Sequence, residues 1–158
     1  MEVKYIQGIK AGIAGGIVLA LSQVLQFVTG LVADWTDLWV LVTAAGCLVF
    51  LLWITVSAGT GALSVRMAAP YMMKLTDAVL ISAVGGGVAG IVNAAMQVLI
   101  AIMTPIFSLN TSDLVGGFAT GVTQGGLTLC CAPIGIILCI VLAIIGGVIY
   151  GIAVLKLQ

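Results

Sequence analysis

A set of uncharged polar side chains interrupts two long apolar segments, and these side chains are the best candidates for binding chemistry. They are Ser22, Gln23, Gln26, Asn93 and Gln97. Ser22 and Gln26 are four residues apart, as are Asn93 and Gln97, so a helix places each pair on one face. Amides and hydroxyls donate and accept hydrogen bonds without carrying charge. The pattern indicates either a polar cavity or hydrogen bonds that hold two apolar helices together.

The four cysteines offer a second kind of chemistry. Cys47 and the pair Cys130 and Cys131 lie in the outer parts of two apolar segments, so a disulfide between them is compatible with an oxidising exterior. Free thiols packed in the membrane are the alternative. The chain has no histidine and the cysteine spacing matches no zinc motif, so we expect neither a metal site nor a cofactor.

Titratable side chains are scarce. General acid–base catalysis needs a titratable group held in a pocket. The acidic residues all lie at the chain start or between the apolar segments, at Glu2, Asp34, Asp37, Asp77 and Asp113. We therefore expect no enzymatic activity. The net charge of zero gives no reason to expect a nucleic-acid partner.

The composition predicts the elements that position these side chains. Apolar residues make up 63% of the chain and charged residues 6%, whereas about a quarter of a soluble domain is charged. A membrane-spanning helix needs about 20 apolar residues. We therefore predict a single all-α transmembrane domain over residues 1–158, a four-helix bundle in the lipid bilayer, with spans at about 9–33, 38–65, 78–107 and 127–155.

The basic residues predict the orientation of this domain. Lys4 and Lys10 precede the first span, Arg66 and Lys74 lie between the second and third, and Lys156 follows the fourth. All five therefore fall on one side of the predicted membrane. The positive-inside rule places both termini in the cytoplasm of a multi-pass protein of the cell membrane.

The segment 108–126 is predicted to lie outside the spans. It is rich in Gly and Thr but retains several large apolar residues. An irregular outer loop, an interfacial helix, a re-entrant segment and a lid are all compatible with this composition. Asn110 begins an Asn-Thr-Ser triplet, which is a glycosylation sequon on the predicted outer side.

The two halves of the chain resemble one another. Residues 11–26 align without gaps against 82–97, and residues 61–67 align against 151–157. This pattern predicts two related helical hairpins of the same orientation, which is a parallel repeat about an axis near the membrane normal. The alternative is a chance likeness between Gly-rich apolar helices.

Several glycines recur at every fourth position, which makes flat stripes where helix backbones can approach closely. They are Gly8, Gly12, Gly16, Gly86, Gly90, Gly147 and Gly151. The stripes indicate either an interface between copies of the chain or packing among the helices of one chain. We favour packing within one chain.

Three apolar segments carry a resemblance to known proteins. They are GCLVFLLWI at 46–54, GALSVRM at 61–67 and CCAPIGIILCIVLAIIGGVIYG at 130–151. With the Gly-rich first span, they resemble small uncharacterised polytopic membrane proteins of archaea. The resemblance implies a Gly-rich four-helix membrane domain and carries no activity.

These features lead to two expected functions. The glycine stripes and the small extramembrane mass favour a non-catalytic structural or accessory subunit, which associates with itself or with other membrane subunits. The alternative is a small neutral-solute or weakly selective membrane channel with an outward-facing polar cavity. Its lining would be formed by Ser22, Gln26, Asn93 and Gln97.

Overall fold

The structure, a computed structural model, describes residues 3–36, 39–72, 74–107 and 114–157, with the backbone alone described at 30–36, 39, 41–43, 45, 104–107 and 114–129. These residues form four long α-helices and one short 3₁₀ helix, η1. The helices are α1 (Val3–Thr36), α2 (Trp39–Ala68), η1 (Ala69–Tyr71), α3 (Leu75–Phe107) and α4 (Leu114–Ala153). Throughout the described ranges, the expected all-helical fold is confirmed.

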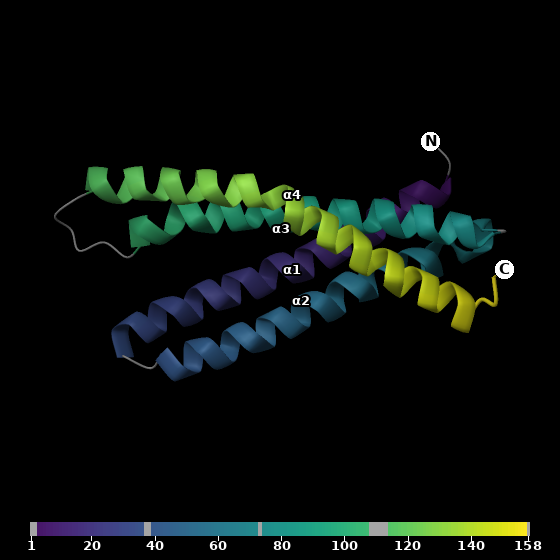
Figure 1. The fold of residues 1–158 in the computed structure, drawn as a ribbon, viewed down its shortest axis with the longest axis horizontal. Coiled ribbons are helices and arrows are strands. Elements are labelled where there is room, and N and C mark those ends of the chain that lie inside the picture. Colours follow the sequence, from purple (N-terminus) through teal and green to yellow (C-terminus); the bar gives the residue numbers. More distant parts are fainter. Residues whose placement is uncertain (1–2, 37–38, 73, 108–113, 158) are drawn as a thin grey trace.

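The long helices pack as two antiparallel pairs, α1 with α2 and α3 with α4 (Figure 1). α1 also contacts α3, and α2 also contacts α4. The two helices in each of these contacts run parallel to one another (Figure 1). The two pairs meet at the end that holds both termini and η1, and they spread apart toward the opposite end (Figure 1). We call these the converging end and the open end.

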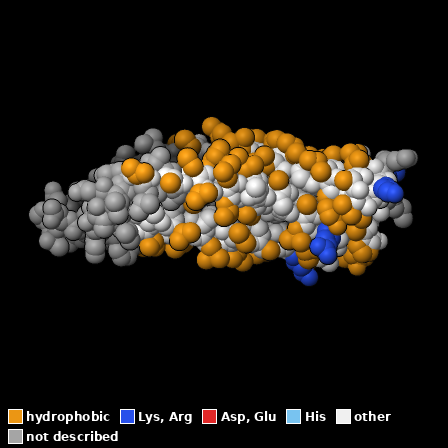
Figure 2. All heavy atoms as spheres, turned by 90° about the horizontal axis from the view of Figure 1, so that it is seen from below, with side chains coloured by type: hydrophobic (Ala, Val, Ile, Leu, Met, Phe, Trp, Pro, Cys, Tyr) orange, Lys and Arg blue, Asp and Glu red, His pale blue; other side chains and the backbone are white. Residues whose placement is uncertain are grey.

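Each long helix contains a stretch long and apolar enough to cross a membrane. These stretches are Val3–Thr29, Gly46–Tyr71, Leu75–Met103 and Cys130–Ala153. Large apolar side chains on all four helices are exposed, among them Leu21, Phe50 and Ile149. Figure 2 shows such side chains covering much of one face, with basic side chains gathered toward the converging end. The prediction of four helices able to span a membrane is confirmed.

The start of α4 differs from the sequence expectation. An irregular outer loop was one of the forms expected for segment 108–126, but α4 begins at Leu114. Residues 114–126 are therefore a continuous part of this helix and not an irregular loop. Gly and Thr are weak helix formers, but neither one prevents a helix from forming. Asn110 lies outside the described residues.

α4 changes direction near its middle, where Pro133 lies (Figure 1). Proline has no backbone N–H and its ring clashes with the preceding turn, so a proline inside a helix bends it. The first half of α4 runs beside α3, and the second half crosses toward α2 (Figure 1). After the bend, α4 contacts both neighbours, with Ala143 lying against Gly61 of α2 and against Gly86 of α3.

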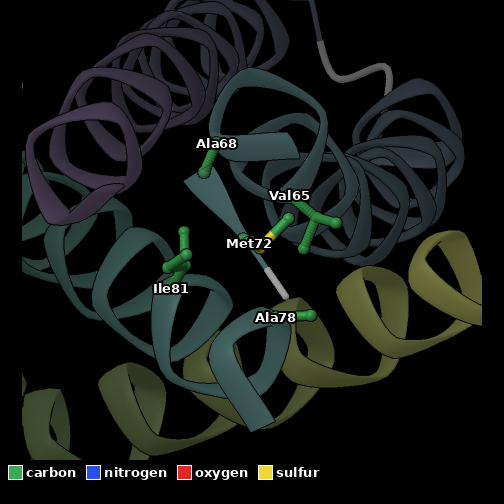
Figure 3. Packing of buried hydrophobic residues seen from close by; sticks show 5 residues of the cluster. All are labelled: Val65, Ala68, Met72, Ala78 and Ile81. Carbon is green, nitrogen blue, oxygen red and sulfur yellow. The ribbon is translucent and has the colours of Figure 1, made fainter. Parts of the chain in front are cut away.

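The hydrophobic core is concentrated at the converging end. Its buried members come from α2, from the segment between η1 and α3, and from α3 itself. Figure 3 shows them together: Val65, Ala68, Met72, Ala78 and Ile81. After α4 the chain turns back, with Lys156 at a φ of 51°. The Leu157 N–H donates to the Gly151 carbonyl (3.1 Å) and the Leu157 side chain packs on this core.

One ion pair joins α1 to α3 at the same end. The Lys4 ammonium lies 3.1 Å from the Asp77 carboxylate. Asp77 is in the first turn of α3, where a negative charge is stabilised by the helix dipole. The converging end is therefore held by apolar packing and by a charge contact.

Candidate functional site

Glycines allow α1 and α3 to touch through their backbones. A Cβ atom added at Gly12 would lie 2.5 Å from the Gly85 carbonyl oxygen, and one added at Gly16 would lie 2.7 Å from Cβ of Val92. At Gly8 the same atom would lie 3.1 Å from the Ile81 carbonyl oxygen. A larger side chain at Gly12 or Gly16 would force the neighbouring atoms to shift, and at Gly8 it would fit only tightly.

The crossing of α2 and α4 is reciprocal. Gly61 lies against the backbone carbonyl of Ala143, and Gly146 lies against the backbone carbonyl of Ala58. Each helix therefore presents an alanine and, three residues later, a glycine to the other. In both cases an added Cβ would overlap backbone atoms, which cannot rotate away as a side chain could.

The remaining glycines of the stripes lie between α3 and its neighbours. A Cβ at Gly86 would lie 2.6 Å from Cβ of Ala143, and one at Gly90 would lie 3.1 Å from Cα of Ile136. Gly147 lies against the Ser82 hydroxyl, and Gly151 is in ordinary contact with Leu75 at 3.5 Å. The stripe glycines thus line contacts between helices of this one chain.

Buried hydroxyls in this half pair with their own helices. Ser57 donates to the Trp53 carbonyl (2.7 Å), Ser64 donates to the Thr60 carbonyl (2.8 Å), and Ser82 donates to the Ala78 carbonyl (2.7 Å). A hydroxyl that is satisfied in this way needs no water. The helices therefore close the converging half with small side chains and few groups that would attract solvent.

A pocket of about 370 Å³ lies between the helices just beyond this closed half. All four helices contribute to its wall. Its lining residues are Gln23 and Gln26 from α1, Gly46, Val49, Phe50 and Trp53 from α2, Gln97 from α3, and Leu138 from α4. Three of the five polar residues selected from the sequence are thereby brought together.

Two aromatic rings form part of the wall and were not selected from the sequence. Phe50 and Trp53 stack with their ring centres 6.2 Å apart and their planes 16° apart. A sequence signal exists, because aromatic residues three positions apart share a helix face. Their role was not evident, since the same pair in an apolar span equally suits contact with lipid.

Ser22 and Asn93 do not line the pocket. Each lies one helical turn closer to the converging end than a pocket glutamine, Gln26 or Gln97. The Ser22 hydroxyl donates to the Leu19 carbonyl (2.7 Å). Asn93 is 4% exposed, and its side-chain oxygen has no hydrogen-bond partner among the described residues.

The cysteines are free thiols in the structure. Cys47, Cys130 and Cys131 are exposed, and Cys139 is buried with its sulfur 3.7 Å from the Ser57 hydroxyl. A disulfide from Cys47 to Cys130 or Cys131 stays a prediction. Among the described residues, no three histidine, cysteine or acidic side chains gather in a way that could hold a metal ion.

The pocket is therefore an uncharged and mainly apolar site, with three amide side chains and an aromatic wall. Three primary amides provide donors and acceptors, and the described lining includes no charged side chain. No protein-family model, curated protein or solved structure matches the chain. Function must be inferred from the pocket and from the packing beneath it.

Proposed function

We propose that this chain is a non-catalytic four-span protein of the cell membrane, whose pocket receives a small neutral polar solute from the outer side. The pocket is the entry half of a permeation path that is closed at the converging end. The observation that carries this proposal is the meeting of Gln23, Gln26 and Gln97 in one cavity.

The membrane placement is supported by the surface of the bundle. Large apolar side chains are exposed along all four helices, which suits lipid and is costly in water. The five basic residues belong to the chain ends and helix ends that meet at the converging end. By the positive-inside rule, this end faces the cytoplasm and the open end faces outward.

The lining supports a neutral solute over an ion. An ion that leaves water needs carbonyl rings or opposite charges to replace its hydration. Amides can replace the hydrogen bonds of a neutral polar molecule, and the stacked rings can cover its less polar face. A volume of about 370 Å³ is near the lower end of the range for small-molecule pockets, about 300–1,000 Å³.

The helix arrangement also supports a parallel repeat. α1 lies beside α3 and α2 beside α4, each in parallel, as a two-fold axis along the bundle would require. The reciprocal crossing makes Ala143 the equivalent of Ala58 and Gly146 the equivalent of Gly61, with the same offset of 85 residues in both cases. The sequence alignment instead pairs Gly61 with Gly151, which is an offset of 90 residues. The two alignments of α2 with α4 therefore differ by about one and a half helical turns.

A structural or accessory subunit is the second candidate. Gly59 favours it, because this glycine is exposed on α2 with no atom within 4 Å of its Cβ position, so another helix could approach it. The stripe glycines face other helices of the same chain, so they are not free to contact a second copy. They therefore support this candidate less than the sequence alone indicated. Self-association would need a different surface.

A liposome flux assay separates the two candidates. Purified protein is reconstituted, and entry of urea and glycerol is followed by light scattering. The double variant Gln26→Leu with Gln97→Leu should reduce the protein-dependent rate about tenfold or more, because two hydrogen bonds at about 1 kcal/mol each are lost. Leu99→Met, on an exposed position of α3, is the matched control and should conduct as the wild type does. A wild type that passes neither solute and always purifies with a partner would support the subunit and overturn the pore.

A further inference from the structure

A shallow groove of about 260 Å³ runs along the outer face of the bundle between α1 and α2. Gly15 and Thr60 are buried and form its floor, while Val18 and Leu63 are exposed and form its edges. At Gly59, which also lines the groove, no atom lies within 4 Å of the Cβ position. Small residues therefore leave an open apolar hollow on a surface that faces lipid in the proposed membrane placement.

Two basic residues extend the groove toward the converging end. Lys10 lies four residues before Ala14, which lines the groove on α1. Arg66 lies three residues after Leu63, which lines it on α2. Residues three or four apart share a helix face, so both basic residues continue the faces that line the groove. Both side chains are exposed, and the groove thus ends at two positive charges.

The two basic residues lie at the same depth along the bundle. α1 and α2 are antiparallel and Gly15 contacts Thr60, so position 10 lies level with position 65. Arg66 is the next residue, about 1.5 Å further along the helix axis. The predicted spans begin at about residue 9 and end at about residue 65, which places Lys10 and Arg66 near the membrane boundary. Long basic side chains reach lipid headgroups from such positions.

The acidic side chains described at this end do not neutralise these two charges. The ion pair there joins Lys4 to Asp77. Among the described residues, neither Lys10 nor Arg66 takes part in an ion pair. The end of the groove therefore complements a negatively charged ligand.

The two charges also decide between the possible occupants of the groove. Copies of the chain share one orientation in a membrane, so a second copy packed through the same face would bring its own two basic residues to the same depth. Four positive charges at one level repel each other. An anionic phospholipid of the cytoplasmic leaflet instead places a negative headgroup at this depth and an acyl chain beside the hollow.

We propose that the groove binds an anionic phospholipid of the cytoplasmic leaflet, with its headgroup between Lys10 and Arg66 and one acyl chain along Gly59. The inference goes beyond the proposed solute pocket and shares only the membrane placement with it. The groove face of α2 runs from Arg66 back to Val56, which is about 15 Å of helix. This length suits the acyl chain of one leaflet, since the whole hydrocarbon core is about 30 Å thick.

The test measures which lipid contacts the groove in a bilayer. Trp35→Phe, Trp39→Phe and Trp53→Phe first remove the three tryptophans of the chain. Leu21→Trp then places a reporter on an exposed position of α1, three residues beyond Val18 and toward the open end. The full chain is reconstituted in vesicles of phosphatidylcholine and phosphatidylglycerol, with one of the two lipids brominated in its acyl chains. Bromine quenches tryptophan on contact, so varying the lipid ratio gives the relative affinity of the two lipids.

We expect the Leu21→Trp reporter to show a preference for phosphatidylglycerol of about fivefold or more, since each basic residue near the membrane surface contributes about fivefold. Lys10→Gln with Arg66→Gln should remove most of this preference. Lys74→Gln with Lys156→Gln is the matched control, because it removes the same charge from exposed positions at the same end. The control should keep the preference.

A second comparison tests the hollow itself. Gly59→Leu fills the groove and should remove most of the preference at the Leu21→Trp reporter, because the acyl chain is displaced. Gly135→Leu makes the same change on α4, where the Cβ position also has no atom within 4 Å. This variant should keep the preference. A Val141→Trp reporter, on an exposed position of α4 away from the groove, should show no preference between the lipids.

Three results would overturn the inference. The first is equal affinity of the two lipids at the Leu21→Trp reporter. The second is an equal loss of preference in both charge variants, and the third is a Leu21→Trp reporter protected from both lipids while Val141→Trp is quenched, which would show that another protein chain covers the groove. All three leave the solute pocket standing, because solute flux is measured independently. If neither reporter is quenched, the chain is not in the bilayer, and the proposed function fails as well.

Discussion

Two glycines of α2 that are two residues apart should respond in opposite ways to the same added methyl group. At Gly61 a Cβ atom overlaps the backbone of Ala143, whereas at Gly59 it meets no atom within 4 Å. Alanine is intrinsically favoured over glycine in a helix by about 1 kcal/mol. Gly59→Ala should therefore raise the free energy of unfolding by about 0.5–1 kcal/mol.

Gly61→Ala brings the same gain in helix propensity, but the steric overlap with α4 costs more than this gain. The added atom would lie well inside the 3.0 Å that real Cβ contacts respect, and the atoms it meets are backbone. α2 and α4 must then move apart, and overpacking of this kind costs about 1–3 kcal/mol or more. We expect a net loss of about 1–2 kcal/mol, which is roughly a five- to thirtyfold change in the unfolding equilibrium constant.

The reciprocal crossing adds a test of the mechanism. Gly146→Ala should cost about as much as Gly61→Ala, because its Cβ overlaps the backbone of Ala58. Once the helices have separated for one methyl group, part of the room for the second exists. The double variant should therefore cost less than the sum of the single variants.

The assay is unfolding by sodium dodecyl sulfate in mixed lipid–detergent micelles, followed by circular dichroism. Gly59→Ala is the matched control, since it makes the same chemical change on the same helix. If Gly61→Ala were as stable as Gly59→Ala, the close crossing of α2 and α4 would be refuted. Strictly additive costs at Gly61 and Gly146 would refute a shared contact.

Two further predictions concern the buried Asn93 side chain and the orientation of the chain in the membrane. Asn93→Leu should raise the free energy of unfolding by about 1–3 kcal/mol, since it removes an unpaired buried oxygen. The same detergent titration measures this change, and a loss of stability would show that the Asn93 amide holds the helices together. For the orientation, a cysteine placed at Lys74 or Lys156 in a cysteine-free chain should react with a membrane-impermeant maleimide only after cells are permeabilised. Labelling of intact cells at either site would reverse the proposed topology.

The contrast between the two halves of the bundle follows from where small residues lie. Toward the converging end, glycine and serine let backbones approach, and their polar groups are satisfied within their own helices. Toward the open end, the bend at Pro133 lies where the pairs begin to spread (Figure 1). Larger side chains such as Trp53 and Gln97 then occupy the space between the pairs. Close packing and an open pocket are thus properties of the same four helices.

The location of the candidate site was only partly accessible from sequence. The spacing of Ser22 with Gln26 and of Asn93 with Gln97 predicted shared helix faces, but it could not tell a cavity from a hydrogen-bonded contact. The structure separates the members of each pair, because Gln26 and Gln97 line the pocket while Ser22 bonds to its own helix. It also brings Trp53 to the same cavity.

Composition and charge spacing alone determined that the chain forms four long apolar helices, because hydropathy is a local property that adds along a segment. They did not determine where α4 begins, since Gly and Thr residues suit both a loop and a membrane helix. Only the tertiary structure decided which neighbours the stripe glycines meet, which amides share a pocket, and which amide oxygen is left unpaired. These outcomes depend on how closely helices that are far apart in the sequence approach one another. A local sequence pattern does not predict the distance between two such helices.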